Sequence, residues 1–291
     1  MRKAKLDYTL LCGIDTISVW TNKPIAEGQY SGIKQIRSIH DVETGEIRYN
    51  YKINVSTYSN RADIKSLEDY MDALAKTMDE LGISELELAR CDIKFDSYED
   101  NFSTMFKMNK LLVLLIAHTN NIKNRYESKD PLRLNDLTVR VQNNYLEAEN
   151  YDKQAQSNYR DNVKNRLELR CKRLLQGNKG LRGCFDFWFK KLDKLPMYYD
   201  AFQMLCNTYL IKKWHEENGN KVKSIAEFIR KYESNIYSRK QLIALFGKLG
   251  VNNPERAADK FKSNSHIEYI TLNDLKMYVR KIKESACDFL G

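Results

Sequence analysis

The stretch LTVRVQNNYLEAENYDKQAQSNYRDNVKNRLELRCKR, residues 137–173, decides the fold class. Its first part alternates between apolar and polar side chains on both sides of QNN, which predicts a hairpin over 137–151. A short helix or loop is expected at 154–162. The alternation then returns in NRLELRCKRLL, residues 165–175, and predicts a further strand. Strands joined by a tight turn pair antiparallel, so this stretch indicates an antiparallel or mixed sheet.

The same patterns predict the strands and helices of the rest of the N-terminal part. Strands are expected at 8–20, twice within 28–57, and at 86–96. Helices are expected at 66–82 and 104–121. Ser66 can cap the first helix with Asp69 three residues on, and Gly82 can end it. Gly45 supplies the positive φ that the turn DVETGE needs. The element order is β-β-β-α-β-α-β-β-β, which predicts the class α+β, with helices on one face of the sheet.

The pattern changes after residue 176, where the segments that follow have helical periodicity. We predict two domains, 1–176 and 177–291, with the boundary near LLQGNKGLRG (174–183). The segment SRKQLIALFGKLGVNNPERAADKFKSN is compatible with a helix-turn-helix or a winged helix, and then Arg239 and Lys240 would contact DNA. A helical domain for dimerisation or for contact with a host protein explains it equally well.

Charge points to an anionic partner. The 291 residues carry a formal net charge of +9. From residue 176 onward there are 21 Lys and Arg against 13 Asp and Glu, whereas the part before it is nearly neutral. A basic surplus of this size favours nucleic acid, although a basic surface without a polyanion partner is the simpler alternative.

The remaining composition excludes several protein classes. The six cysteines form no CxxC and no Cys/His pair at zinc spacing, so we expect reduced thiols and a bacterial cytoplasm. The longest apolar run, LLVLLIA at 111–117, is too short to span a bilayer. Asp7 and Asp15 interrupt any signal-peptide core. No P-loop or dinucleotide-binding glycine motif follows a predicted strand.

Two predicted strands carry regularly spaced charges. In ARCDIKFD, Asp92 and Asp96 lie on one face with Lys94 between them. In NRLELRCKR, Glu168 shares a face with the basic residues Arg166, Arg170 and Lys172. Carboxylates on one face suit a hard divalent cation, and the basic residues suit phosphates. Taken alone, each spacing favours a solvated, charged strand face.

A tyrosine stands at the end of the predicted hairpin. Tyr151 is followed by Asp and then by Lys153. A tyrosine hydroxyl has a pKa near 10, so attack on phosphorus needs electrostatic help from a metal or a nearby lysine. Most tyrosines in a chain with 18 of them are packing residues. Tyr145 and Tyr159, close by in the sequence, are candidates for a second nucleophile, although packing explains them more readily.

The order of four motifs resembles a known family. IDTISV (14–19), RCDIKFD (90–96), NYDKQAQ (150–156) and RLELRCKR (166–173) are similar to the motifs of replication initiators of rolling-circle plasmids, conjugative transposons and filamentous phages. The resemblance covers residues 8–175 and implies a metal-dependent DNA nickase. It implies that Tyr151 is the nucleophile and Lys153 its basic neighbour. It also implies that Asp92 and Glu168, with Asp96, hold Mg²⁺ or Mn²⁺, while Asp15 matches an acidic position without an assigned role.

Two positions depart from that pattern. Glu149 stands where the family often has a basic residue, and Arg170 stands where a second acidic residue is common. The resemblance implies a partner DNA, as origin duplex and as single strand. A homodimer and a host helicase or polymerase are further partners that it leaves open. The two departures keep a second hypothesis open, a DNA-binding regulator without nicking activity. A relaxase for conjugative transfer would use the same chemistry.

Overall fold

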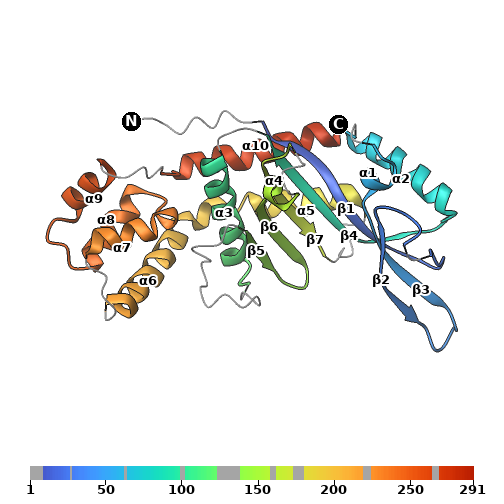
Figure 1. The fold of residues 1–291 in the computed structure, drawn as a ribbon, viewed down its shortest axis with the longest axis horizontal. Coiled ribbons are helices and arrows are strands. Elements are labelled where there is room, and N and C mark those ends of the chain that lie inside the picture. The colour runs from blue at the N-terminus through green and yellow to red at the C-terminus, as the bar shows by residue number, and fades with distance from the viewer. Residues whose placement is uncertain are drawn as a thin grey trace.

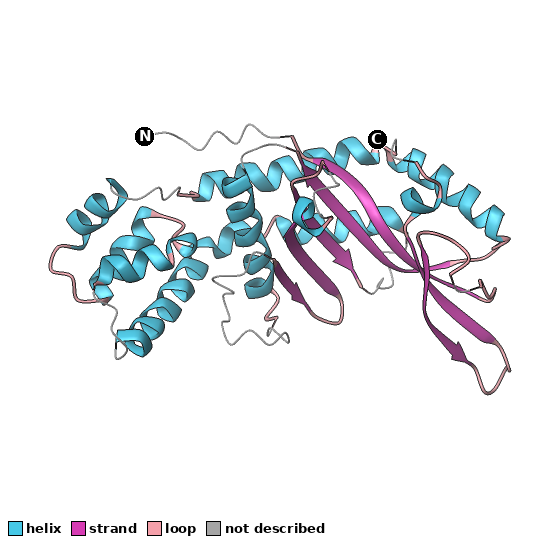
Figure 2. Cartoon of the chain, in the orientation of Figure 1, coloured by secondary structure: helices cyan, strands magenta, loops and turns pink. Residues whose placement is uncertain are grey.

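The computed structural model shows an α+β protein with a curled antiparallel sheet and a helical C-terminal part, which confirms the predicted class (Figure 1). Figure 2 colours the strands magenta and the helices cyan, and shows helices without strands at one end of the molecule. The structure describes residues 9–26, 28–61, 64–98, 102–122, 138–157, 162–172, 180–218, 224–263 and 269–291.

The sheet has seven strands, and every neighbouring pair is antiparallel, in the order β2-β3-β1-β4-β7-β6-β5. Their bounds are β1 Leu11–Thr21, β2 Ile33–His40, β3 Ile47–Ile53, β4 Glu87–Ser97, β5 Val139–Gln142, β6 Leu146–Asp152 and β7 Asn165–Cys171. The predicted strand segments agree with these bounds to within a few residues. The pairing of β4 with β7 joins segments far apart in the sequence and places Asp92 opposite Arg170.

The hairpin of β2 and β3 extends away from the rest of the sheet (Figure 1). Its turn contains Gly45 with φ of 71°, as the sequence predicts. The Asp41 carboxylate accepts hydrogen bonds from the backbone of Glu43 and Thr44. The tight turn therefore rests on a residue that adopts positive φ without strain and on an Asp that satisfies the exposed backbone donors.

Helices in the N-terminal part are α1 Val55–Tyr58, α2 Leu67–Leu81, α3 Phe102–Thr119 and α4 Lys153–Gln156. The α2 helix begins and ends as predicted. Ser66 and Asp69 form a capping box, and Gly82 at the C-cap has φ of 61°. The buried residues of α2 recur at helical spacing, from Leu67 through Leu74 to Leu81, so one face packs on the core while the other meets solvent.

Removal of the α2 cap gives a first test of the fold. Ser66→Ala is expected to lower the free energy of unfolding by about 1 kcal/mol, because the backbone N–H of Asp69 loses its acceptor. Urea unfolding followed by circular dichroism measures the change. Ser66→Thr, which keeps a hydroxyl at the cap both to accept from the backbone of Asp69 and to donate to its carboxylate, is the matched control and should retain most of the stability.

The described residues from 180 onward form helices and no strand. Their bounds are α5 Leu181–Leu192, η1 Leu195–Tyr198, α6 Tyr199–Asn218, α7 Ile225–Lys231, η2 Glu233–Asn235, α8 Arg239–Lys248, α9 Pro254–Ser263 and α10 Leu272–Leu290. The α6 to α9 helices gather at one end of the molecule, whereas α5 and α10 run back along the sheet (Figure 1). The α8 and α9 helices contact each other across the turn at Gly250. The predicted domain boundary falls largely on residues 173–179, which lie outside the described residues.

The sheet presents two different faces. On one, Ile93 of β4 and Leu167 and Leu169 of β7 are fully buried under helices. Cys171 on this face lies 3.7 Å from the carbonyl oxygen of Cys184 in α5. Asn109 of α3 bonds to Asn165 of β7, which shares this face by alternation, and Tyr278 of α10 bonds to Asn109. Strand alternation places Asp92 and the charged residues beside it on the opposite face. The helices thus cover the apolar face, as predicted, and two of those that do so come from the C-terminal part.

All six cysteines are free thiols. Among the residues that the structure describes, no helix has both the length and the apolar character needed to cross a bilayer.

Candidate active site

Three central strands bring the charged residues of the sequence motifs together in rows. Antiparallel pairing sets each residue of β4 opposite one of β7, and each of these opposite one of β6. The three rows are Asp96, Arg166 and Tyr151; Lys94, Glu168 and Glu149; and Asp92, Arg170 and Glu147. Because side chains alternate across a strand, all nine lie on the face opposite to the helices. The predicted nucleophile and the predicted metal ligands therefore share one surface.

Tyr151 and Glu168 are in direct contact. The Tyr151 hydroxyl donates a hydrogen bond to Oε1 of Glu168. The tyrosine is only 6% exposed. Burial and then the charge of Glu168 raise the pKa of Tyr151 well above its usual value, while Arg166 opposes this. The hydroxyl is therefore protonated at neutral pH, with a carboxylate in place to accept its proton.

Arg166 links three of the predicted residues. Its guanidinium donates two hydrogen bonds to Asp96, at 2.6 and 2.9 Å, and one to Asp15 at 2.7 Å. Although burial opposes ionisation, the charge of Arg166 holds the pKa of Asp15 below its usual value. Asp15, whose role the sequence leaves unassigned, thus helps to hold the guanidinium directly across from Tyr151.

Arg170 is surrounded by carboxylates. Its guanidinium contacts Glu147 and Glu168, lies 2.8 Å from Glu149 and lies 3.5 Å from Asp92. The two positions that depart from the family pattern, Glu149 and Arg170, are therefore ion-pair partners. Burial raises the pKa of Glu149, and the charge of Arg170 offsets only part of that.

Acidic and basic side chains lie at different depths on this face. The carboxylates of Asp92, Asp96, Glu147 and Glu168 are between 1% and 4% exposed. Four basic side chains around them are 26–37% exposed, namely Arg90, Lys94, Arg140 and Lys172. The face therefore presents cations to solvent above a layer of buried anions.

The predicted metal ligands do not fit a divalent cation as they are arranged. Asp92 accepts two hydrogen bonds from Arg90, at 2.6 and 2.7 Å, and Asp96 accepts two from Arg166. Glu168 is engaged by Tyr151 and Arg170. Within the described residues, no group of three or more His, Cys, Asp or Glu is placed to hold a metal ion. Each candidate oxygen set already has a guanidinium as its cation.

The other predicted residues lie around this centre. The Lys153 ammonium is 5.9 Å from the centroid of the Tyr151 ring and hydrogen-bonds to Gln156. Arg166 and Arg170, predicted to contact phosphates, direct their guanidinium groups to internal carboxylates, whereas Lys172 is 27% exposed. Tyr145 is exposed in the β5–β6 turn, and Tyr159 lies outside the described residues.

Arg239 and Lys240 lie at the start of α8, in the helical end of the molecule. Arg239 pairs with Asp259 of α9 at 2.8 Å, and Lys240 pairs with Asp200 of α6 at 3.5 Å. These four side chains are 45–76% exposed. Exposed ion pairs of this kind contribute little to stability and exchange readily for other partners.

Three residues of the charged face were missed by the sequence reasoning: Arg90, Arg140 and Glu147. Arg140 pairs with Glu147 at 2.6 Å, and the charges of Arg170 and Arg140 lower the pKa of Glu147 although burial opposes it. The signal was present in the sequence, because the alternation of VRVQ and LEAENYD places Arg140 and Glu147 on the same face as Tyr151.

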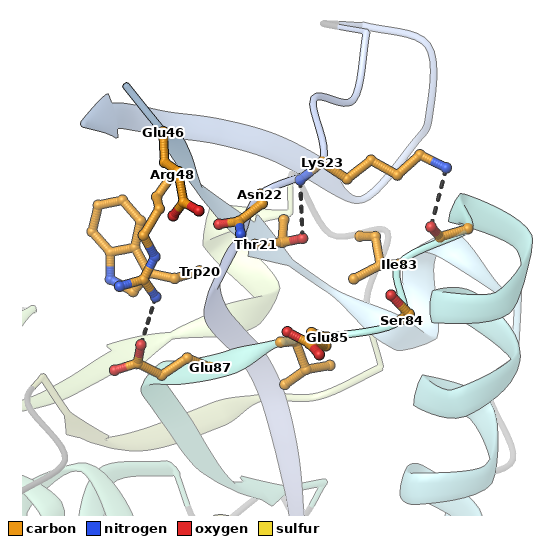
Figure 3. A pocket seen from close by; sticks show the side chains of 12 residues that line it. Trp20, Thr21, Asn22, Lys23, Glu46, Arg48, Ile83, Ser84, Glu85 and Glu87 are labelled. Atoms are coloured by element: carbon orange, nitrogen blue, oxygen red, sulfur yellow. Dashed lines mark hydrogen bonds and ion pairs between the residues drawn. The ribbon is translucent and has the colours of Figure 1, made fainter. Parts of the chain in front are cut away.

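A pocket of about 620 Å³ lies at the other end of β1 and β4 (Figure 3). Figure 3 shows the Trp20 ring beside Arg48, which pairs with Glu87 at 2.5 Å. The guanidinium carbons of Arg37 and Arg48 lie 5.0 and 5.6 Å from the ring centroid. Leu11 of β1 pairs with Asp96, which lies in the same row as Tyr151. Trp20 is nine residues further along β1, a distance of roughly 30 Å. The residues that line the pocket include no tyrosine, cysteine or histidine, whereas the other face holds a tyrosine in contact with a carboxylate. The Tyr151 face is therefore the better candidate for an active site.

Comparison with known proteins adds one remote structural likeness. No family model matches the chain, and no curated protein matches it. Among solved structures, the chain is similar to a rolling circle replication initiator protein from Geobacillus stearothermophilus, with a TM-score of 0.28 and 10% identity. That match covers 56% of this chain and 75% of the other. At this TM-score the match leaves the function to be inferred from the residues of this chain.

Proposed function

We propose that this protein nicks one DNA strand through Tyr151 and thereby initiates rolling-circle replication. The observation that carries the proposal is the hydrogen bond from the Tyr151 hydroxyl to Glu168. A nucleophile in contact with a base is the arrangement that covalent catalysis requires. The order of the sequence motifs supports DNA as the substrate, because Tyr151, Lys153, Asp92 and Glu168 match positions of the resembling family, while Glu149 and Arg170 depart from it.

The geometry supports a transfer in which charges and protons balance. As the Tyr151 oxygen forms its bond to phosphorus, Glu168 takes the hydroxyl proton. The bond from phosphorus to the 3′ oxygen breaks, and that oxygen leaves as a 3′-OH after it takes a proton from water. Arg166, directly opposite Tyr151, stabilises negative charge that develops on the phenolic oxygen. The products are a 5′-phosphotyrosine adduct and a free 3′-OH that a polymerase can extend.

Surface charge supports the docking of DNA on this face. The partly exposed basic side chains around the carboxylates reach solvent more than the acidic groups do, so incoming phosphates would meet them first. The Arg239 and Lys240 pairs at the helical end can exchange Asp259 and Asp200 for phosphate oxygens. With the net charge of +9, binding is expected to weaken steeply as salt rises, since bound counterions are released from DNA.

Loss of the Tyr151 hydroxyl should abolish nicking. A supercoiled plasmid that carries the element's own origin is incubated with wild-type protein or Tyr151→Phe, in EDTA and separately in Mn²⁺. A denaturing gel then reports nicks and protein–DNA adducts. The wild type should nick and form the adduct, and Tyr151→Phe should do neither while it binds the origin equally well. Tyr145→Phe is the matched control and should retain activity, because that side chain is exposed in a turn.

A second function is favoured by a specific observation. Arg166, Arg170, Asp92, Asp96 and Glu168 are all engaged with one another or with neighbouring side chains. A fully paired face suits a DNA-binding regulator that does no chemistry. Origin binding without nicks from the wild type in either buffer would support that function and reject the nickase. Nicking that survives Tyr151→Phe would move the nucleophile to another residue.

A further inference from the structure

The Arg170 guanidinium stands at the convergence of four carboxylates from three strands. Glu147 and Glu149 come from β6, Glu168 from β7 and Asp92 from β4, and each has an oxygen within 3.5 Å of a guanidinium nitrogen. The Arg170 side chain is 12% exposed. A guanidinium carries five N–H donors in a fixed plane, which lets one side chain serve several carboxylates at once.

A cation is required at this position. Glu149 and Glu168 face each other directly across β6 and β7, and like charges opposite each other destabilise a sheet. Buried carboxylates of this density are otherwise found around hard divalent cations, which take oxygen ligands. Arg90 and Arg140 each compensate one carboxylate at the margin, Asp92 and Glu147, and leave the centre to Arg170.

A divalent ion and Arg170 cannot both occupy the centre. The oxygens that would coordinate an ion are those that the guanidinium already contacts, and a second cation within a few ångströms would be repelled strongly at this depth. Arg170 also engages Glu168 through Oε2, the carboxylate whose Oε1 accepts the Tyr151 hydrogen bond. The same guanidinium therefore fixes the orientation of the proposed base.

We propose that Arg170 is the resident cation of this site, in the place of a divalent metal, and that it positions Glu168 against Tyr151. The wild-type protein accordingly binds no divalent ion among Asp92, Glu147, Glu149 and Glu168. The expectation that nicking proceeds in EDTA rests on the proposed function. The occupancy of the carboxylate cluster by Arg170 does not depend on that function.

Removal of the guanidinium should convert the cluster into a metal site. Purified full-length wild type, Arg170→Lys and Arg170→Gln are titrated with Mn²⁺ alone. Free Mn²⁺ is followed by electron paramagnetic resonance, and thermal unfolding is recorded in EDTA and in 10 mM Mn²⁺. We expect Arg170→Gln to bind one Mn²⁺ with a Kd on the order of 0.1 mM and to gain about 5 °C in melting temperature. Wild type and Arg170→Lys, which keep the positive charge, should show neither change.

The control removes one carboxylate from the new site. Arg170→Gln combined with Glu149→Gln should weaken Mn²⁺ binding at least tenfold. Stoichiometric Mn²⁺ binding by the wild type that Glu168→Gln abolishes would overturn the proposal, as would a folded Arg170→Gln protein that gains no Mn²⁺ affinity. If Arg170→Gln is unfolded in EDTA, folding in 10 mM Mn²⁺ supports the proposal. If it stays unfolded in Mn²⁺, the titration of the wild type tests the proposal, because Mn²⁺ binding that Glu168→Gln abolishes overturns it and an absence of binding supports it.

The nicking assay separates this inference from the function on which its catalytic part rests. Equal nicking by the wild type in EDTA and in Mn²⁺ supports both proposals. Nicking that depends on Mn²⁺ overturns the metal-free role of Arg170 and keeps the nickase. An absence of nicking in both buffers rejects the nickase, and the Mn²⁺ titrations still decide what occupies the carboxylate cluster.

Discussion

Arg166→Met is expected to lower the free energy of unfolding by about 3–5 kcal/mol at pH 7, the cost of leaving buried charges without their partner. The guanidinium is 6% exposed and makes three hydrogen bonds, to Asp96 and Asp15. Methionine fills a similar length but offers no donor. Lys94, 3.5 Å from Asp96, remains as a partial replacement and sets the lower end of the range. Urea denaturation at pH 7 measures the loss.

The same variant carries a pH signature. Arg166 holds the pKa of Asp15 below its usual value against the effect of burial. A lowered carboxyl pKa stabilises the folded state above the unfolded pKa, near 4, and this contribution is lost as the pH falls through the folded value. The difference in the free energy of unfolding between wild type and Arg166→Met should therefore be largest at pH 7 and should become smaller below about pH 4.

An exposed pair provides the control for Arg166. Arg280 on α10 pairs with Glu284 one helical turn away, and the two side chains are 80% and 55% exposed. Arg280→Met should cost less than about 0.5 kcal/mol, because solvent screens such a pair. Equal losses from the two variants would contradict the structural role given to Arg166.

In the proposed nicking reaction, Glu168 is the general base, and Glu168→Gln is expected to slow that reaction by about 10²–10⁴-fold, the usual contribution of such a base. Glutamine keeps the shape of the side chain but carries no charge and takes up no proton. The Tyr151 pKa, which the charge of Glu168 helps to raise, should fall in this variant. The residual nicking rate should then rise with pH, since hydroxide must remove the proton. Single-turnover nicking of a labelled origin strand between pH 6 and 9 measures both effects.

Glu284→Gln makes the same chemical change on the surface of α10, and its nicking rate should match the wild type. DNA affinity in a shift assay should be similar for the wild type, Glu168→Gln and Glu284→Gln, since the Glu168 side chain is 3% exposed and lies beneath the partly exposed basic side chains. A Glu168→Gln protein that nicks at the wild-type rate would show that another group accepts the Tyr151 proton.

Local patterns were enough to predict the strands and the helix α2. Strand alternation, the DVETGE turn and the Ser66 to Gly82 caps depend on neighbours in the sequence, and the structure agrees with all three. The return of α5 and α10 to the sheet was not predicted. Their contacts join residues as far apart as Leu10 and Ser285, and no local period encodes such a pairing.

The contacts within the candidate site could be predicted from the sequence only in part, for a different reason. Alternation predicts that Asp92 and Asp96 share one face of their strand. It predicts the same for Arg166, Glu168 and Arg170 on a second strand. It does not predict the register between the two strands. The pairing of β4 with β7 sets each Arg opposite an Asp. Arginines that the sequence suggested for phosphate contact therefore neutralise carboxylates, because a buried carboxylate without a cation costs several kcal/mol.

The path of α10 also determines when this protein can fold as it is synthesised. The hydroxyl of Ser285 bonds to the backbone of Leu10, across 275 residues of chain. At elongation rates of roughly 5–20 residues per second, those residues take on the order of tens of seconds to emerge from the ribosome. Until then, the start of β1 lacks the helix that covers it, and a nascent chain exposes apolar sheet surface. Translation pauses and chaperone supply should therefore affect the yield of this protein more than that of one whose sheet is covered by local helices.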